Sequence, residues 1–517
     1  MSTHLRNLPA AMFLSVLAAL MLWPSLAAVG LVPGRLEVFE KRQLAPFPPP
    51  VSSLVTWEKW PRSFETFFDD HLPNRGVLLR LNAWMKYNLF ATSPTPAVLV
   101  GREGWLFHAM PDDLREAAGR LEQTPAEIRQ LRIVLEERHD ALAEHGIDYL
   151  VLVAPTKQTV YPDKLPAWLV PGGPNRGRRE RLLEELERAD SPVAIEDFTA
   201  ALVEARHRHG DDVYYRHDSH WTYRGACEAY AWLANRHPEW FRPPAADWVE
   251  PSVERPSNLM HLMGLPGEET SVFPQPRTGF HVRPRPLDTR WLQSLAERCH
   301  VDVSTGPTGD GVLYFLADSF AGWNKPYLAE NFSRTVLVNP WDARLQRYAQ
   351  FPLDHIRAEK SRLVIQQLIE NRLDVGAGAM SLLADPTGNT HPPMVRAARL
   401  RRLFAAGDSV AAPFRQQGPF TVISPPKPAS AYIIRVEVEA AEPCLMGTIS
   451  PYAPDAAPTN DPIIRNFELT RHPVLPGGFT AILCGSPAAD SGQIRLRFDK
   501  PGARVIAVQL APHPDID

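Results

Sequence analysis

The sequence has little cysteine and no surplus of positive charge. Four cysteines occur in 517 residues, and none shows the CxxC or Cys/His spacing that is typical of a structural zinc site. The formal net charge is −4, so the chain has no basic field that would attract the phosphates of a nucleic acid. We therefore expect neither a zinc-stabilised fold nor a nucleic-acid-binding protein.

Charge is also missing near the N-terminus, where no charged residue occurs between Arg6 and Arg35. The apolar core of this stretch, 8–32, is long enough to span a hydrocarbon layer of roughly 30 Å as a helix. Arg6 on the short leading side predicts a cytoplasmic N-terminus and an exported, periplasmic body. Residues 25–27 (Ser-Leu-Ala) also resemble a signal-peptidase site, so a cleaved signal is the alternative. We favour an uncleaved inner-membrane anchor within residues 1–32, because the apolar run is long for a signal core.

The chain shows no internal repeats and no low-complexity tail, and 44% of its residues are hydrophobic, as in globular proteins. A chain of this length is expected to form two globular parts. We predict a proline-rich tether over 33–60, an α/β domain over 61–385 and a β-sandwich over 400–517.

The α/β prediction rests on buried apolar runs that alternate with helical patterns. The clearest helix spans 125–145, where Thr124 is a good N-cap and Glu127 completes a capping box. It leads directly into an apolar run at 149–154, and this alternation predicts a doubly wound parallel sheet. The other predicted strands are 193–196, 212–215, 312–317, 335–339 and 362–366, and the other predicted helices are 61–71, 75–90, 178–188, 197–207 and 223–235.

After about residue 375 the pattern changes to an alternation with period two, which is typical of antiparallel strands. This part contains Cys444 and Cys484, which can form a disulfide in an oxidising compartment; two buried thiols are the alternative. The predicted strands of this β-sandwich are 432–438, 463–469, 479–483, 493–498 and 505–510.

A serine and an Asp-x-His pair are the candidate catalytic residues. Ser319 follows the apolar run 312–316, and open α/β sheets place their active sites just past the carboxyl ends of such strands. The segment 214–222 (YYRHDSHWT) supplies Asp218 and His220, which point the same way if they lie on a strand. A serine hydroxyl needs an imidazole to remove its proton and a carboxylate to orient that imidazole. We therefore predict a triad of Ser319, His220 and Asp218.

Two other interpretations of these residues stay open. Asp-x-His alone is also typical of a fragment of a metal site, with His217 as a third ligand, although the predicted triad needs neither a metal nor a cofactor. Asp318 is a rival orienting acid for the imidazole. Adjacent residues on a strand point apart, so we rank Asp318 second.

Several segments occur in a fixed order over about residues 60–375: 67–75 (FFDDHLPNR), 100–107 (VGREGWLF), 154–162 (APTKQTVYP), 215–222 (YRHDSHWT) followed by Gly225, and 317–320 (ADSF). Together they resemble the alginate O-acetyltransferase family of the AlgJ/AlgX type, whose catalytic domain is similar to that of SGNH hydrolases. The resemblance implies an SGNH-hydrolase-like fold in which Asp218, His220 and Ser319 form the triad.

The resemblance leaves parts of the site open. Ala317 stands where the hydrolases have glycine, and their separate asparagine oxyanion donor is not located by the sequence. Candidates for that donor are Asn324, Asn331 and Asn339. Within the matching segments, candidate substrate-binding residues are Trp221, Lys157 and Tyr161, with packing as the alternative for Trp221.

The resemblance implies an exported O-acetyltransferase that modifies hydroxyls of an exopolysaccharide, with a membrane-bound O-acyltransferase as the partner that supplies acetyl groups. No coenzyme-A site is evident. Alternatives are a polysaccharide acetylesterase and a non-catalytic polysaccharide-binding subunit of an export complex. By its position the β-sandwich resembles a carbohydrate-binding module, with a structural cap as the alternative, since it has few aromatic residues for sugar stacking: Tyr432, Tyr452, Phe467 and Phe479.

Overall fold

The computed structural model describes six residues of the N-terminal stretch and most of the chain from residue 45 on. The predicted anchor or signal, 1–32, lies mostly outside the described residues, as does the first part of the tether. Within the described part, no helix is both long and apolar enough to cross a membrane. The described N-terminal residues are 14, 15, 18, 22, 23 and 26, and the residues after 45 that are not described are 52, 72–74, 122, 170–176, 211, 298, 308–310, 340–350, 374–392, 418–419, 443, 450–470, 475–476, 486, 488–491, 499–501 and 516–517.

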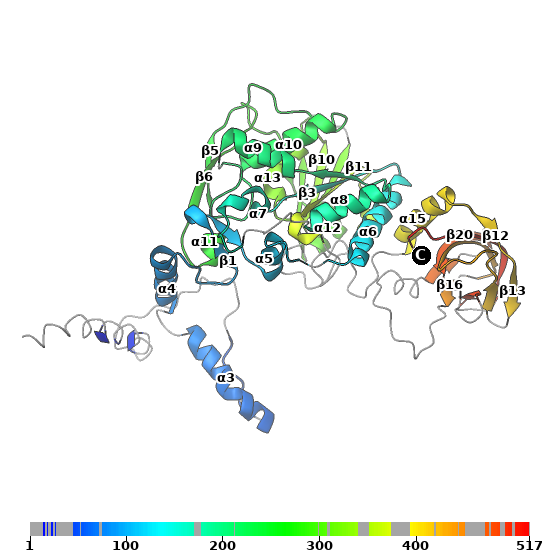
Figure 1. The fold of residues 1–517 in the computed structure, drawn as a ribbon, viewed down its shortest axis with the longest axis horizontal. Helices are drawn as coiled ribbons and strands as arrows, with labels where there is room; N and C mark the ends of the chain where they lie inside the picture. Colours follow the sequence, from blue (N-terminus) through cyan, green and yellow to red (C-terminus); the bar gives the residue numbers. More distant parts are fainter. Residues whose placement is uncertain are drawn as a thin grey trace, which may run out of the picture.

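A seven-stranded sheet forms the centre of the first domain (Figure 1). Five neighbouring strands are parallel, and two antiparallel strands extend one edge. The prediction of an α/β fold built on a mostly parallel sheet is therefore confirmed, although the antiparallel edge was not expected. In spatial order the strands are β4 (Ala194–Asp197), β3 (Asp148–Ala154), β11 (Ser361–Ile369), β9 (Val312–Leu316), β10 (Arg334–Asn339), β8 (His300–Thr305) and β7 (Arg283–Arg285).

Helices cover both faces of the sheet, which is why its inner strands contain continuous apolar runs, such as 149–154 in β3 and 312–316 in β9. In β3, Leu150 and Leu152 pack into the core on one face, while Val151 and Val153 pack into the core on the other. The first core is covered by α9 (Thr199–His209), α10 (Tyr223–Arg236) and α13 (Ala321–Ala329), and the second by α6 (Pro125–Ala143), α8 (Arg178–Arg188), α12 (Arg290–Ala296) and α14 (Leu353–Ala358).

Some local predictions hold and others fail. The capping box of α6 is present, with Thr124 accepting from the Glu127 N–H and Glu127 accepting from the Thr124 N–H. The strand predicted at 212–215 is wrong, because Tyr214 makes only an isolated bridge to Trp221. That segment is apolar because it packs in the core as a loop.

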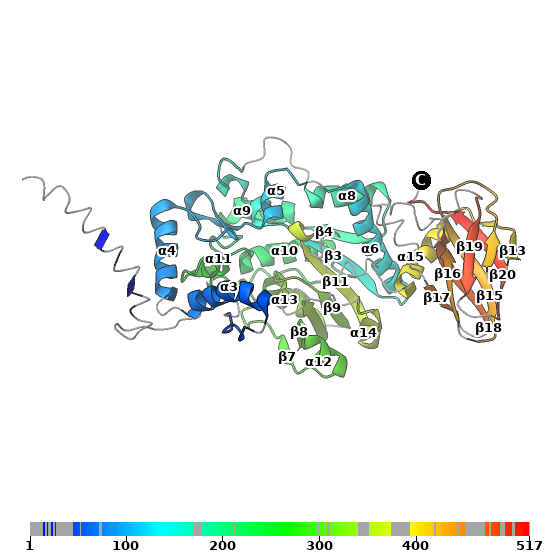
Figure 2. The same cartoon turned by 90° about the horizontal axis from the view of Figure 1, so that it is seen from below.

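Two helices stand apart from the sheet at the N-terminal side (Figures 1 and 2): α3 (Leu54–His71) and α4 (Arg75–Phe90). The helix predicted at 61–71 is the second half of α3, which begins earlier and continues through Pro61. The remaining short elements of this domain are β1 (Val98–Val100), β2 (Leu106–His108), α5 (Pro111–Ala117), α7 (Lys157–Val160), β5 (Ser252–Pro256), α11 (Asn258–Leu262) and β6 (Glu268–Val272).

The C-terminal part is an antiparallel β-sandwich of two sheets. The predicted strands there are confirmed except 463–469, which lies outside the described residues. Cys484 is buried in the first sheet, and the side chain of Cys444 is not described, so the disulfide and the two buried thiols both stay open as alternatives. In spatial order, the strands of the first sheet are β12 (Val410–Ala411), β20 (Ala503–Pro512), β15 (Tyr432–Ala440) and β18 (Gly477–Gly485). The strands of the second sheet are β13 (Phe414–Gln417), β14 (Phe420–Ile423), β19 (Ile494–Phe498), β16 (Cys444–Ile449) and β17 (Arg471–Val474).

Helix α15 (Pro393–Ala406), which the sequence did not predict, lies between α6 and the sandwich (Figure 2). Leu400 and Phe404 of this helix pack against the sandwich. Its buried Arg399 donates to Glu136 of α6, with an Nε–Oε2 distance of 2.8 Å, and also pairs with Asp515 beyond the last strand. The two domains are thus joined by an apolar contact and a buried ionic network.

Candidate active site

Ser319 lies directly beyond the carboxyl end of β9. The Ala317 N–H still donates to the Val338 carbonyl of β10, so sheet pairing continues to that residue. The chain then leaves the sheet and enters α13 at Ala321. Ser319 occupies the turn between them and is exposed at the edge of the sheet.

Asp218 and His220 lie on a tight loop that precedes α10. The loop is closed by the Tyr214–Trp221 bridge and by a bond from the Tyr215 N–H to the His220 carbonyl. Thr222 then caps α10, because its hydroxyl accepts from the Gly225 N–H at 3.1 Å. The predicted helix start is therefore correct, but the pair sits on a loop rather than on a strand.

The three predicted triad residues meet in one hydrogen-bonded chain. The Ser319 Oγ lies 2.8 Å from His220 Nε2, and His220 Nδ1 lies 2.7 Å from Asp218 Oδ1. Asp218 also accepts from the backbone N–H groups of His220 and Asn258. This arrangement places the imidazole proton on Nδ1 and leaves Nε2 as the acceptor for the serine hydroxyl.

The surroundings keep Asp218 ionised and the imidazole in place. Burial raises the pKa of Asp218, but the hydrogen bonds and charge of His220 and the backbone N–H groups outweigh it, so the pKa lies below its usual range. Trp323 of α13 stacks on the His220 ring with a centroid distance of 4.3 Å. Phe320 contacts the same ring at 4.8 Å. The imidazole is therefore oriented by packing as well as by Asp218.

Residues 98–286 match the model of the family described as "ALGX: SGNH hydrolase-like domain, acetyltransferase AlgX". This match confirms the resemblance to the AlgX family. It covers Asp218 and His220 and ends before Ser319. The SGNH-hydrolase-like fold is confirmed with it, and residues 98–286 are similar to a family whose model is described as an acetyltransferase.

Solved structures that are similar to parts of this chain include the following three. Bacillus cereus PatB1 with a sulfonyl adduct is 17% identical, with a TM-score of 0.41, and the match covers 55% of this chain and 99% of that one. The O-acetyltransferase domain of Pseudomonas putida AlgJ is 18% identical (TM-score 0.37; 60% and 100% covered). Pseudomonas aeruginosa AlgX is 12% identical (TM-score 0.34; 81% and 92% covered). No curated protein sequence matches.

A pocket of about 390 Å³ opens at His220 and Ser319. Of the three asparagine candidates for an oxyanion donor, Asn339 at the end of β10 lines this pocket. Asn324 instead bonds to Gln367, and Asn331 bonds to Tyr230 and to backbone carbonyls of α13. The strand-end rule that located Ser319 also accounts for Asn339.

The three predicted substrate-binding residues are placed differently from one another. Trp221 and Tyr161 are fully buried and do not line the pocket: the Trp221 indole donates to the Phe320 carbonyl, and Tyr161 stacks on Trp105. Lys157 lines the pocket with part of its surface, but its ammonium group donates to three backbone carbonyls.

Asp318 is the rival of Asp218 as the acid that orients His220. Asp318 accepts hydrogen bonds from the Phe320 N–H and the Gln367 amide. Burial raises its pKa to about 6, whereas the pKa of Asp218 is lowered, so the ionised form is favoured more strongly at Asp218. For the alternative of a metal site, His217 was the third candidate ligand, and its Nδ1 lies 3.8 Å from Glu269 Oε1. Among the described residues, no group of three or more His, Cys, Asp and Glu side chains is arranged to hold a metal ion.

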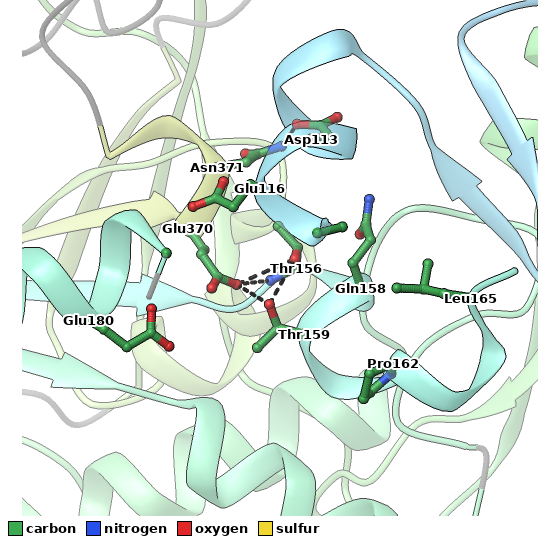
Figure 3. Close-up of a pocket in the computed structure, with 12 residues that line it drawn as sticks. Asp113, Glu116, Thr156, Gln158, Thr159, Pro162, Leu165, Glu180, Glu370 and Asn371 are labelled. Carbon is green, nitrogen blue, oxygen red and sulfur yellow. Dashed lines mark hydrogen bonds between the residues drawn. The ribbon is translucent and has the colours of Figure 1, made fainter. Parts of the chain in front are cut away.

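A second cavity of about 200 Å³ adjoins the first and shares Thr156, Gln158 and Asn371 with it (Figure 3). Its wall includes Glu370, which directly follows β11 and accepts from the Thr156 N–H and the Thr159 hydroxyl. Sequence reasoning missed these polar residues, although Glu370 and Asn371 follow a predicted strand and the strand-end rule applies to them as well. The other carboxylates drawn there are Asp113, Glu116 and Glu180.

Proposed function

We propose that this protein is an exported O-acetyltransferase that transfers acetyl groups to hydroxyls of an exopolysaccharide through an acyl-enzyme on Ser319. One observation carries the proposal: the chain Asp218–His220–Ser319 with contacts of 2.7 and 2.8 Å at the carboxyl edge of the sheet. The family match to an acetyltransferase domain supports acyl transfer as the chemistry.

The geometry supports a two-step reaction. The Ser319 Oγ attacks the acetyl carbonyl while its proton moves to His220 Nε2, and Asp218 stabilises the resulting imidazolium. The carbon–oxygen bond to the donor then breaks, and the leaving oxygen takes the proton from His220. In the second step a sugar hydroxyl gives its proton to His220 and attacks the acyl-enzyme, which releases Ser319 with its proton restored.

The negative charge on the carbonyl oxygen requires hydrogen-bond donors in both steps. The backbone N–H of Ser319, next to the first turn of α13, is one candidate. The side chain of Asn339 in the same pocket is the other. Both lie at the same sheet edge as the nucleophile, as an oxyanion site has to.

The location that we propose is the periplasmic face of the inner membrane, with a membrane-bound O-acyltransferase as the acetyl supplier. The uncharged stretch between Arg6 and Arg35 supports this location. So do the exposed apolar side chains of α3 and α4, because aromatic residues are enriched where proteins meet the membrane–water interface. These side chains include Trp57, Phe68, Trp84, Leu89 and Phe90.

For the β-sandwich, the structural-cap interpretation gains support over the carbohydrate-binding one. Tyr432, one of its few candidate stacking residues, is buried and its hydroxyl bonds to the Lys427 carbonyl. The sandwich also packs on α15, which in turn contacts α6 of the catalytic domain.

The test uses the full chain purified in detergent, beside Ser319→Ala. Both are incubated with a chromogenic acetyl ester, with and without a sugar oligomer, and acetate release and mass gain of the oligomer are followed. Mass gain that requires Ser319 supports transfer. Ser319-dependent release without mass gain favours the esterase. The absence of any Ser319-dependent reaction removes the triad assignment and favours a binding subunit.

A further inference from the structure

Lys157 is a buried cation whose bonds all go to the loop that carries the triad acid. It is 2% exposed and begins α7, just beyond the carboxyl end of β3. Its Nζ donates to the carbonyls of Tyr215, Arg216 and Asp218 at 3.0, 3.2 and 2.6 Å. One ammonium group thus binds three of the four residues 215–218, and the last of them is the triad acid itself.

Glu269 of β6 binds the same loop through its N–H groups. Its carboxylate accepts from the backbone N–H of Arg216 at 2.8 Å and of His217 at 2.9 Å. The carbonyls of this loop are therefore held by a cation and its amides by an anion. These side chains satisfy the backbone carbonyls and N–H groups that a neighbouring strand would bond if the loop were part of a sheet.

Asn258 completes the set at the far end of the loop. Its backbone N–H donates to Asp218 Oδ2 at 2.8 Å, and its side-chain oxygen accepts from the Ser219 N–H at 3.0 Å. From Tyr215 to Ser219 the loop is bound by groups from three separate elements: α7, β6 and α11.

The setting of Lys157 shows that this arrangement is held at an energetic cost. Its ammonium lies over the rings of Trp105 and Phe107, with centroid distances of 5.5 and 5.2 Å. Burial lowers the pKa of Lys157 to about 7, and the charges of Glu269 and Asp218 offset part of that effect. Burying a cation without contact to solvent is unfavourable unless its hydrogen bonds are complete.

We propose that Lys157 and Glu269 are positioning residues that hold Asp218 and His220 at the distance from Ser319 that proton transfer requires. Lys157 acts on the loop through its carbonyls, and it is not a substrate ligand. This proposal rests on the proposed function, since it assumes that the triad performs the reaction. A displacement of about 1 Å of a catalytic group can lower the rate by roughly 100-fold.

The test is Lys157→Met, which keeps the length of the side chain and removes the donors. With the chromogenic acetyl ester we expect kcat to fall roughly 100-fold and KM to change by less than about threefold, because ground-state binding is intact. Lys164→Met is the matched control: Lys164 is another buried lysine seven residues on, and its Nζ bonds to Glu103 instead of the loop. Its kcat should equal that of the wild type.

A double variant separates positioning from any other role. If Lys157 acts only through His220, then Lys157→Met should change the residual activity of His220→Ala by less than about threefold, because the two effects are not additive. Additive losses would overturn the proposal. So would wild-type activity of Lys157→Met, or a raised KM with unchanged kcat, which would make Lys157 a substrate ligand.

Glu269→Gln provides an independent approach if Lys157→Met does not fold. Gln keeps the shape but has one acceptor oxygen where the loop uses two, so kcat should fall at constant KM here as well. Unchanged kcat in this variant would also overturn the proposal. The proposed function fails separately, by undiminished activity of Ser319→Ala in the same assay.

Discussion

Replacing Asp218 with asparagine tests the catalytic arrangement directly. Its carboxylate accepts hydrogen bonds from the His220 ring, the His220 backbone N–H and the Asn258 backbone N–H. An asparagine has one acceptor oxygen, so its NH2 group has to face either the ring together with the His220 N–H, which share Oδ1, or the Asn258 N–H at Oδ2. When it faces the ring, the imidazole accepts at Nδ1 and carries its proton on Nε2. It can then no longer remove the proton of Ser319.

The magnitude follows from the cost of that wrong tautomer. In a Ser-His-Asp triad an Asp→Asn substitution preserves the geometry and lowers kcat by about 10⁴-fold. This equals about 5.4 kcal/mol of transition-state stabilisation at about 1.36 kcal/mol per factor of ten. Asp318→Asn is the comparison, because its oxygen can keep the bonds from Phe320 and Gln367. Even the loss of one such bond would cost only roughly 1 kcal/mol, so kcat should fall by less than about tenfold.

The assay is the initial rate with a chromogenic acetyl ester for the wild type and both variants, at equal concentrations of protein whose folding is verified by thermal melting. The reasoning requires Asp218→Asn to be the far weaker enzyme. If Asp318→Asn lost about four orders of magnitude and Asp218→Asn less than one, the orienting acid would be Asp318 and the structural assignment would be refuted.

Two further predictions concern stability. Burial raises the pKa of Asp318 to about 6, so between pH 7 and 5 the folded protein takes up a proton that the unfolded chain does not. The free energy of unfolding of the wild type should therefore rise relative to that of Asp318→Asn as the pH falls over this range, and urea titrations showing the reverse trend would contradict the assignment. A methyl group at Gly225 would meet a backbone carbonyl at 2.3 Å, whereas one at Gly322 would meet nothing within 4 Å. Gly225→Ala should thus lose roughly 3 kcal/mol and melt at a lower temperature, while Gly322→Ala melts like the wild type; equal melting temperatures would show that the loop before α10 yields to the added methyl.

Much of the fold was predictable because buried parallel strands leave a strong signal. The run 312–316 is apolar at every position, and its neighbours β10 and β11 contain shorter apolar runs at 336–338 and 363–365. The same signal located Ser319, since open α/β sheets place their active sites just past the carboxyl ends of such strands. By contrast, β8 has charged and hydroxyl side chains and an antiparallel partner, so its sequence carries no continuous apolar run. The segment 212–215 shows the opposite error, because its apolar residues pack in the core without strand pairing.

The contacts of Lys157 were the least accessible from the sequence. From the sequence alone, a lysine in a short motif beyond a strand is equally compatible with binding a charged or hydroxylated substrate and with binding another part of the chain. Its partners are backbone carbonyls about 60 residues further along the chain, and carbonyls have no residue identity. Glu269 is hidden for the same reason, since it binds backbone N–H groups. Only the folded loop reveals that both side chains serve one segment.

Helix α15 has a consequence for anyone who divides this protein into fragments. Ala398 packs into the core of the catalytic domain, whereas Leu400 and Phe404 pack against the sandwich. In a fragment that ends before the helix, Glu136 loses its bond to Arg399. In a fragment that ends after it, Leu400 and Phe404 lose the sandwich and are exposed to water. Neither cut leaves a surface suited to solvent, so proteolytic separation should yield aggregating pieces instead of two stable modules.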